Sequence, residues 1–207
     1  MGLSVKTELS CFYCGGVRVY RELFPASRCL FMYRDIISVA KSRYRISTVE
    51  PAYRILYLLG RLSGRLARVM FNFNGFNSFD TCVQLDNDLM VGVLLWALST
   101  ATYLDMRRRG VDVRAVRYED LIACPLDVCW ALLKFCHLPL SLAEQGVKAF
   151  DVDSQINSVV ANSVLENFKD PELTPGRRAK LNELLKQFGV PLIGGEVIIE
   201  GTLTCSQ

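Results

Sequence analysis

The chain has 207 residues, a formal net charge of +3, 51% hydrophobic residues and 22% charged residues. This balance is typical of a folded domain and excludes a disordered, highly charged chain. So small a net charge gives no reason to expect nucleic acid as a partner. Because this length suffices to bury a core, we expect one domain spanning residues 1–207, with two small domains as the alternative.

The eight cysteines follow no regular spacing. Cys11 and Cys14 form one C-x-x-C without a second pair, so we predict no metal site and mostly buried free thiols. The N-terminus lacks the apolar core of a signal peptide, and the sequence has no Asn-x-Ser/Thr sequon. We therefore expect a cytoplasmic location, with the Golgi lumen as the alternative if a membrane anchor precedes this sequence.

The first elements in the chain are a predicted strand at Leu3–Thr7 and a helical pattern over Val17–Leu23. After a turn at Phe24 and Pro25, an apolar run at Cys29–Tyr33 predicts a strand that is covered on both faces, as in a parallel sheet.

Arg34 follows this second strand, and a predicted helix runs from Ile36 to Arg45. Arg34 should therefore lie at the carboxyl end of a strand, where ligands bind in open α/β sheets. Ser42 lies eight positions further on, about two helical turns into the helix. A guanidinium, a hydroxyl and a helix N-terminus are all groups that bind phosphate. The alternative is an ordinary surface arginine and helix serine.

This strand-end arginine with a serine eight residues later resembles the 3′-phosphate-binding element of sulfotransferases, which use 3′-phosphoadenosine 5′-phosphosulfate (PAPS). The resemblance implies that Arg34 and Ser42 hold the nucleotide's 3′-phosphate.

Next come a predicted helix over Pro51–Phe71 and a loop over Asn72–Ser78 that could line an acceptor pocket. The arginines of this helix lie on one side, which we interpret as its solvated face rather than a phosphate site. A further helix is predicted over Leu89–Arg109, ended by Gly110. Its apolar run is short for a membrane span, so we expect a buried core helix and no transmembrane segment.

The alternating residues Val111–Arg117 predict another strand, followed by Tyr118–Leu121 and a helix over Pro125–Phe135. This unit resembles the late strand-helix unit of sulfotransferases, which implies that Tyr118 contacts the bound nucleotide. The alternative is a core tyrosine with a hydrogen-bonded hydroxyl. We expect Glu119 and Asp120 to cap and brace the turn. His137 should complement the helix dipole rather than act in catalysis.

The tail resembles the C-terminal end of an invertebrate-type sulfotransferase branch. The matching residues are Asp151–Gln155, where Ser154 and Gln155 are placed near the ligand, a terminal helix over Pro171–Phe188, Gly189–Pro191 and Glu200–Thr202. Together the resemblances cover most of residues 20–203.

The resemblance implies an α/β fold, in which a parallel sheet has helices on both faces, as in the P-loop-NTPase-like sulfotransferase fold. We expect this fold to be N-terminally truncated. The family's 5′-phosphosulfate loop should lie upstream of Arg34, where there is neither a Pro-x-Ser-Gly-Thr-like loop nor a G-x-x-x-x-G-K-S/T motif.

The implied function is transfer of a sulfuryl group from PAPS to a hydroxyl or amine acceptor, a carbohydrate or small alcohol, with 3′,5′-ADP as product and no metal. Arg34, Ser42 and Tyr118 are the cofactor-binding candidates, and the catalytic residue is unassigned. The alternative is a catalytically inactive, truncated relative that binds a nucleotide or a partner. A nucleotide kinase is disfavoured because no Walker loop is present.

Overall fold

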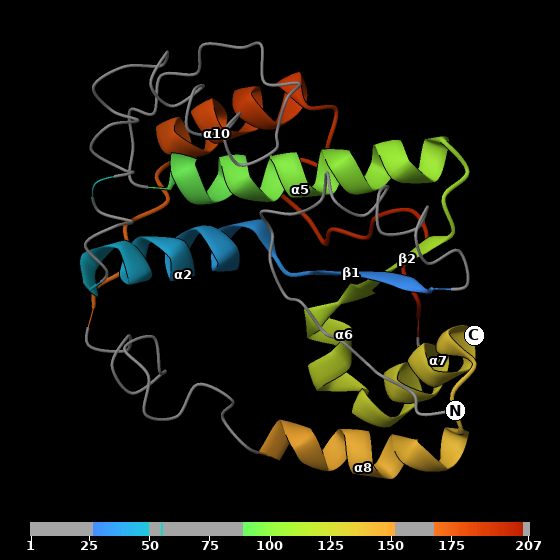
Figure 1. The fold of residues 1–207 in the computed structure, drawn as a ribbon. Helices are drawn as coiled ribbons and strands as arrows, with labels where there is room; N and C mark the ends of the chain where they lie inside the picture. The colour runs from blue at the N-terminus through green and yellow to red at the C-terminus, as the bar shows by residue number, and fades with distance from the viewer. Residues whose placement is uncertain (1–26, 50–54, 56–88, 152–167, 205–207) are drawn as a thin grey trace.

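The computed structural model of the chain describes residues 27–49, 55, 89–151 and 168–204 (Figure 1). Two strands, β1 (Cys29–Tyr33) and β2 (Val113–Arg117), pair in parallel along their whole length. Parallel strands need a long crossover, and here it contains α2 (Ile36–Val49) and α5 (Met90–Arg108). The predicted bounds of β1 are confirmed, but the expectation that both faces are covered is wrong, because Leu30 and Met32 are exposed. Strand β2 begins two residues later than predicted.

Helix α5 forms the centre of the main core. Its first half is buried throughout, which confirms the predicted core helix, and Gly110 follows it with a φ of +77°. Helix α5 lies across β1 and α2, and α10 (Pro175–Gln187) packs on its far side (Figure 1). Helix α10 starts later than predicted because Thr174 accepts a hydrogen bond from the Arg177 N–H and Pro175 occupies the first helical position.

The opposite face of the sheet carries shorter helices and a second, smaller core (Figure 1). These elements are α6 (Tyr118–Ala123), α7 (Pro125–Cys136), η1 (Leu140–Leu142), α8 (Ala143–Lys148) and η2 (Ala149–Asp151). Helix α7 ends at Cys136, one residue beyond the predicted Phe135, and His137 caps it in a left-handed conformation with a φ of 56°.

Residues 196–203, called the C-terminal strap here, add a third backbone segment to the sheet. The Ala115 N–H donates to the Gly201 carbonyl at 3.0 Å, and the Leu203 N–H donates to the Ala115 carbonyl at 2.9 Å. Thr202 thereby forms a parallel bridge with Ala115, on the edge of β2 that β1 leaves free.

Two buried tyrosines hold the strap from the core side. The Tyr33 hydroxyl lies 3.0 Å from Thr202 Oγ1 and accepts a hydrogen bond from the Ile199 N–H at 3.3 Å. The Tyr103 hydroxyl donates to the Glu200 carbonyl at 2.7 Å. Phe31 stacks on Tyr103 with ring centroids 4.8 Å apart, so the rings of β1 and α5 form one layer, which the Tyr103 hydroxyl joins to the strap.

The chain is therefore an α/β protein, mostly helical in its described part, with a small parallel sheet and helices on both sides. None of the helices that the structure describes has the length and apolarity to cross a membrane. Of the four cysteines that the structure describes, Cys129 is buried, whereas Cys29, Cys124 and Cys136 are half-buried, so the prediction that most are buried is wrong for these four.

Several predictions fall outside the described residues. They concern the strand Leu3–Thr7, the pair Cys11 and Cys14, the helix over Val17–Leu23, the helix over Pro51–Phe71 apart from Ile55, the loop Asn72–Ser78, and Ser154 with Gln155.

Candidate functional site

The carboxyl ends of β1 and β2 meet at one corner of the molecule. Tyr33 pairs with Arg117 at the last rung of the ladder, so the next residues, Arg34 and Tyr118, are neighbours across the two strands. The Arg34 guanidinium carbon lies 4.7 Å from the centroid of the Tyr118 ring, a cation–π contact. The parallel register thus brings together two of the three residues that the sequence nominated.

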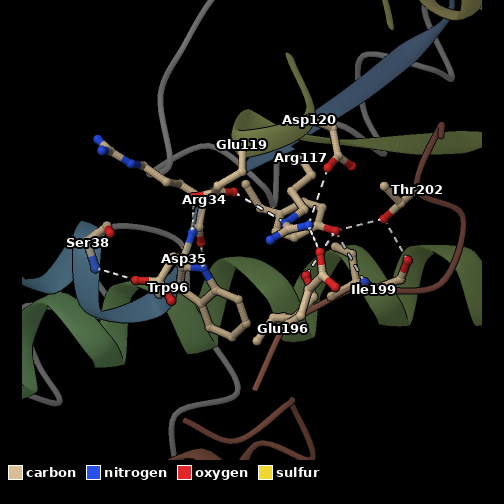
Figure 2. A network of polar contacts seen from close by, with 12 residues as sticks. Arg34, Asp35, Ser38, Trp96, Arg117, Glu119, Asp120, Glu196, Ile199 and Thr202 are labelled. Atoms are coloured by element: carbon tan, nitrogen blue, oxygen red, sulfur yellow. Dashed lines mark hydrogen bonds and ion pairs between the residues drawn. The ribbon is translucent and has the colours of Figure 1, made fainter. Parts of the chain in front are cut away.

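The Arg34 backbone is fixed, while its side chain is exposed. Its carbonyl accepts a hydrogen bond from the Trp96 indole N–H at 2.9 Å, which ties the corner to α5. Figure 2 shows the Arg34 side chain extending away from the Arg117 guanidinium. No carboxylate in the described part of the chain pairs with Arg34, so its guanidinium is available to an anion there.

The first turn of α2 is capped by the protein's own carboxylates. Asp35 Oδ1 accepts a hydrogen bond from the Ser38 N–H at 2.8 Å, and the Asp35 N–H donates to Glu119 Oε1 at 2.9 Å. Glu119 therefore braces the start of α2, a contact across the two strand ends that the prediction for its own turn at Tyr118–Leu121 did not include. These carboxylates already accept from the Ser38 and Asp35 amides, so the N-terminus of α2 offers fewer free amides to an anion. The Arg34 guanidinium is therefore a stronger anion-binding group than this helix N-terminus.

Ser42 lies six residues into α2, about 9 Å along the helix axis from Ile36. Ser47 and Thr48 donate to carbonyls three residues earlier, each at 2.6 Å, but the half-buried Ser42 hydroxyl makes no such bond within the described ranges. No contact between described residues joins Ser42 to Arg34.

Asp170 lies against the same helix and was not nominated from the sequence, where no local pattern marks it. It accepts hydrogen bonds from Arg45 Nε at 2.6 Å and Nη2 at 2.9 Å, and Lys41 Nζ lies 3.5 Å away. The hydrogen bonds from Arg45 hold the pKa of Asp170 below its ordinary value against the opposing effect of burial, and the nearby charges of Arg45 and Lys41 add to this.

Arg117 gathers three carboxylates beside the corner (Figure 2). Its Nε lies 3.4 Å from Glu119 Oε2, its Nη1 lies 3.3 Å from Asp120 Oδ1, and Glu196 forms an ion pair with Nη1. Burial disfavours the charged guanidinium, yet the hydrogen bond to Glu196 and the three negative charges raise the pKa of Arg117 above its ordinary value. Sequence reasoning missed this cluster because Glu196 lies 79 residues after Arg117.

Tyr118 is half-buried, and its hydroxyl has no hydrogen-bond partner among the residues with described positions. The hydrogen-bonded core tyrosine considered as an alternative therefore does not match this part of the structure. What Tyr118 does contact is the guanidinium of Arg34, through the face of its ring.

His137 lies away from this corner, beside the residue that precedes β1. Its Nε2 lies 2.8 Å from Nη2 of Arg28, and since a guanidinium can only donate, the imidazole accepts. Arg28 also pairs with Asp112, just before β2, so His137 belongs to the amino ends of the strands.

A surface pocket lies instead on the outer part of α10 and is lined by Leu173, Pro175, Arg178, Ala179 and Asn182. None of the corner residues borders it. Among the residues that the structure describes, no three histidine, cysteine, aspartate or glutamate side chains are grouped so as to hold a metal ion.

No protein-family model, curated protein or solved structure matches this chain.

Proposed function

We propose that this chain is a sulfotransferase-like domain of the P-loop-NTPase-like fold. It binds PAPS, or its product 3′,5′-ADP, at the carboxyl ends of β1 and β2 and transfers the sulfuryl group to a hydroxyl or amine acceptor. One observation carries the proposal: Arg34 and Tyr118 directly follow adjacent parallel strands, and the Arg34 guanidinium carbon lies 4.7 Å from the Tyr118 ring centroid, with no carboxylate partner in the described ranges. Ligands of open α/β sheets bind at such an edge.

In this proposal the three residues have different roles. Arg34 binds the 3′-phosphate, because a planar guanidinium presents two parallel N–H donors to phosphate oxygens. Tyr118 supports the guanidinium through its ring and adds a contact to the nucleotide. Ser42, whose hydroxyl makes no hydrogen bond within the described ranges, is the second phosphate donor.

A second candidate function is nucleotide binding without transfer. The observation that favours it is the corner itself, whose described residues offer a guanidinium and an aromatic ring to a nucleotide but no group assigned to the 5′-phosphosulfate. Transfer needs an anion cradle, a cation at the bridging oxygen and a base for the acceptor proton. No described residue of the corner is assigned as that base.

Calorimetric titration with 3′,5′-ADP and with 5′-AMP tests the binding site. The two ligands differ in the 3′-phosphate, so 3′,5′-ADP should bind more tightly. Arg34→Gln should weaken 3′,5′-ADP binding about tenfold to a hundredfold and leave 5′-AMP binding nearly unchanged. The control is Arg109→Gln, an exposed arginine just past the end of α5 that pairs with Asp105. Equal binding of the two ligands, or no effect of Arg34→Gln, would contradict the proposal.

Radiolabelled PAPS with a panel of carbohydrate, alcohol and amine acceptors separates the two candidates. Label that appears in an acceptor supports the transferase. Binding of 3′,5′-ADP without transfer to any acceptor supports the second candidate, and the absence of binding contradicts both.

A further inference from the structure

The C-terminal strap places one carboxylate at the candidate site. Glu196 is 62% exposed, and in the part of the chain that the structure describes its carboxylate contacts Arg117 alone. Arg117 itself is only 16% exposed and belongs to the last rung of β2, next to Tyr118. Glu196 of the strap thus forms an ion pair with Arg117 at the sheet edge where the proposed nucleotide binds (Figure 2).

Glu196 is the most dispensable of the three carboxylates around Arg117. Glu119 links Arg117 to the corner, because its Oε1 accepts the Asp35 N–H while its Oε2 lies beside Arg117 Nε. Asp120 lies within the first turn of α6, three residues from Arg117. These two carboxylates already exceed the single charge of Arg117, so Glu196 is not needed to neutralise it.

The charges of the corner do not favour a strongly anionic ligand. Two guanidiniums, those of Arg34 and Arg117, lie there with four carboxylates: Asp35, Glu119, Asp120 and Glu196. Like charges a few ångströms apart repel at a partly exposed site, so the phosphates of a ligand meet an excess of negative charge. Of the three carboxylates around Arg117, the most exposed is that of Glu196, which can therefore leave most readily.

We infer that Glu196 is an internal competitor of the anionic ligand: its carboxylate occupies Arg117 when the site is empty and must leave when a phosphate binds. The inference rests on the proposed function for the nature of the ligand. It makes Glu196 a residue that limits affinity for anions beside the corner, and it gives Arg117 a role as a second anion-binding cation, separate from the Arg34 guanidinium (Figure 2).

The strap can release Glu196 without detaching from the sheet. Its main anchors are the Tyr33 hydroxyl at Ile199 and Thr202, the Tyr103 hydroxyl at Glu200, and the backbone bonds of Ala115. None of these involves the Glu196 carboxylate. Removing its charge should therefore change ligand affinity while the fold stays intact.

The test compares Glu196→Gln with the wild-type chain at low ionic strength, using 3′,5′-ADP and inorganic pyrophosphate as probes. Glu196→Gln should bind each probe about three- to tenfold more tightly, and added salt should shrink the difference. Glu196→Asp keeps the charge and should remain near the wild-type affinity. Near-ultraviolet circular dichroism and thermal unfolding check that each variant folds.

Glu200→Gln is the matched control. Glu200 lies on the same strap and is also exposed, but it pairs with Arg107 instead, with an N–O distance of 3.0 Å. Neutralising it should leave both affinities unchanged. An equal gain in Glu200→Gln would overturn the inference, because the effect would then come from net charge alone.

Pyrophosphate separates this inference from the proposed function. If 3′,5′-ADP binds no variant but pyrophosphate binds Glu196→Gln more tightly than the wild type, the nucleotide assignment fails and the competition stands. If pyrophosphate affinity is the same in both, the competition is refuted whatever the nucleotide does. Introducing Arg117→Gln into the Glu196→Gln chain should abolish the gain, and a gain that survives would also overturn the inference.

Discussion

A side-chain carbon placed on Gly92 would lie 2.5 Å from the Cα atom of Ala40. Helices α2 and α5 therefore cross backbone to backbone, which only a glycine at this position permits. One turn after Gly92, the Trp96 indole N–H donates a hydrogen bond to the Arg34 carbonyl. The same crossing thus packs the core and holds the corner that carries the candidate site.

Gly92→Ala should lower the free energy of unfolding by about 1–3 kcal/mol, because the extra methyl group meets backbone atoms that cannot rotate away. Urea denaturation measures this change. Gly176→Ala is the control, since Gly176 lies in the exposed first turn of α10 with nothing near the added carbon. That control should be neutral or slightly stabilising. A Gly92→Ala chain as stable as the wild type would show that the two helices can move apart at little cost.

Tyr33→Phe should destabilise the fold by about 1–3 kcal/mol, because it removes the hydroxyl that accepts from the Ile199 N–H and contacts Thr202, both buried. Tyr44→Phe serves for comparison, since the Tyr44 hydroxyl has no hydrogen bond among the described residues. Amide hydrogen exchange should show faster exchange of the strap in Tyr33→Phe alone. Equal exchange in both variants would mean that other contacts hold the strap.

Asp170→Asn should remove a pH-dependent part of the stability. The folded pKa of Asp170 is lowered, chiefly by hydrogen bonds from Arg45, so its contribution is present above the unfolded aspartate pKa of about 3.9. The contribution is lost as pH falls through the folded value. At neutral pH the variant should be less stable by on the order of 1 kcal/mol, and the difference should vanish in acid.

Urea denaturation of the Asp170→Asn and wild-type chains across this pH range provides the measurement. Asp105→Asn is the matched control, because Asp105 makes an exposed i,i+4 pair with Arg109. Its effect should stay below about 0.5 kcal/mol. A difference for Asp170→Asn that persists unchanged in acid would assign its effect to packing rather than to charge.

Tyr118→Phe should bind 3′,5′-ADP as the wild type does, whereas Tyr118→Leu should weaken binding about three- to tenfold. Phenylalanine keeps the ring face under the Arg34 guanidinium, and leucine removes it. Calorimetry measures both constants. If Tyr118→Phe were as weak as Tyr118→Leu, the hydroxyl rather than the ring would be the group that matters.

Local patterns predicted the elements that form the corner. The apolar run Cys29–Tyr33 predicted the bounds of β1, although not the exposure of Leu30 and Met32, and Gly110 marks the end of α5. These predictions need only neighbouring residues. The nearness of Arg34 and Tyr118 was not among them, because it requires β1 and β2 to be parallel neighbours in this register.

The contacts of the strap and of Asp170 could not be predicted in this way. Glu196 and Asp170 are single acidic residues in segments without periodic pattern, and their partners Arg117 and Arg45 are far away in sequence. Charge complementarity alone cannot choose among the many arginines of the chain. The tertiary fold brings Asp170 and Glu196 to their arginines. Burial of Leu181 and Leu185 holds α10 on the core, and α10 lies between these two acidic residues in the sequence.

The two strands come from distant parts of the chain, and this bears on how the protein folds. Arg28 contacts Asp112 just before the ladder and Asp35 contacts Glu119 just after it, each pair 84 residues apart in sequence. Closing so long a loop costs entropy before any ladder bond forms, so high contact order predicts slow folding. Until that closure, the apolar helix between the strands has no partner sheet, and chaperones that shield such a surface should raise the yield of refolding.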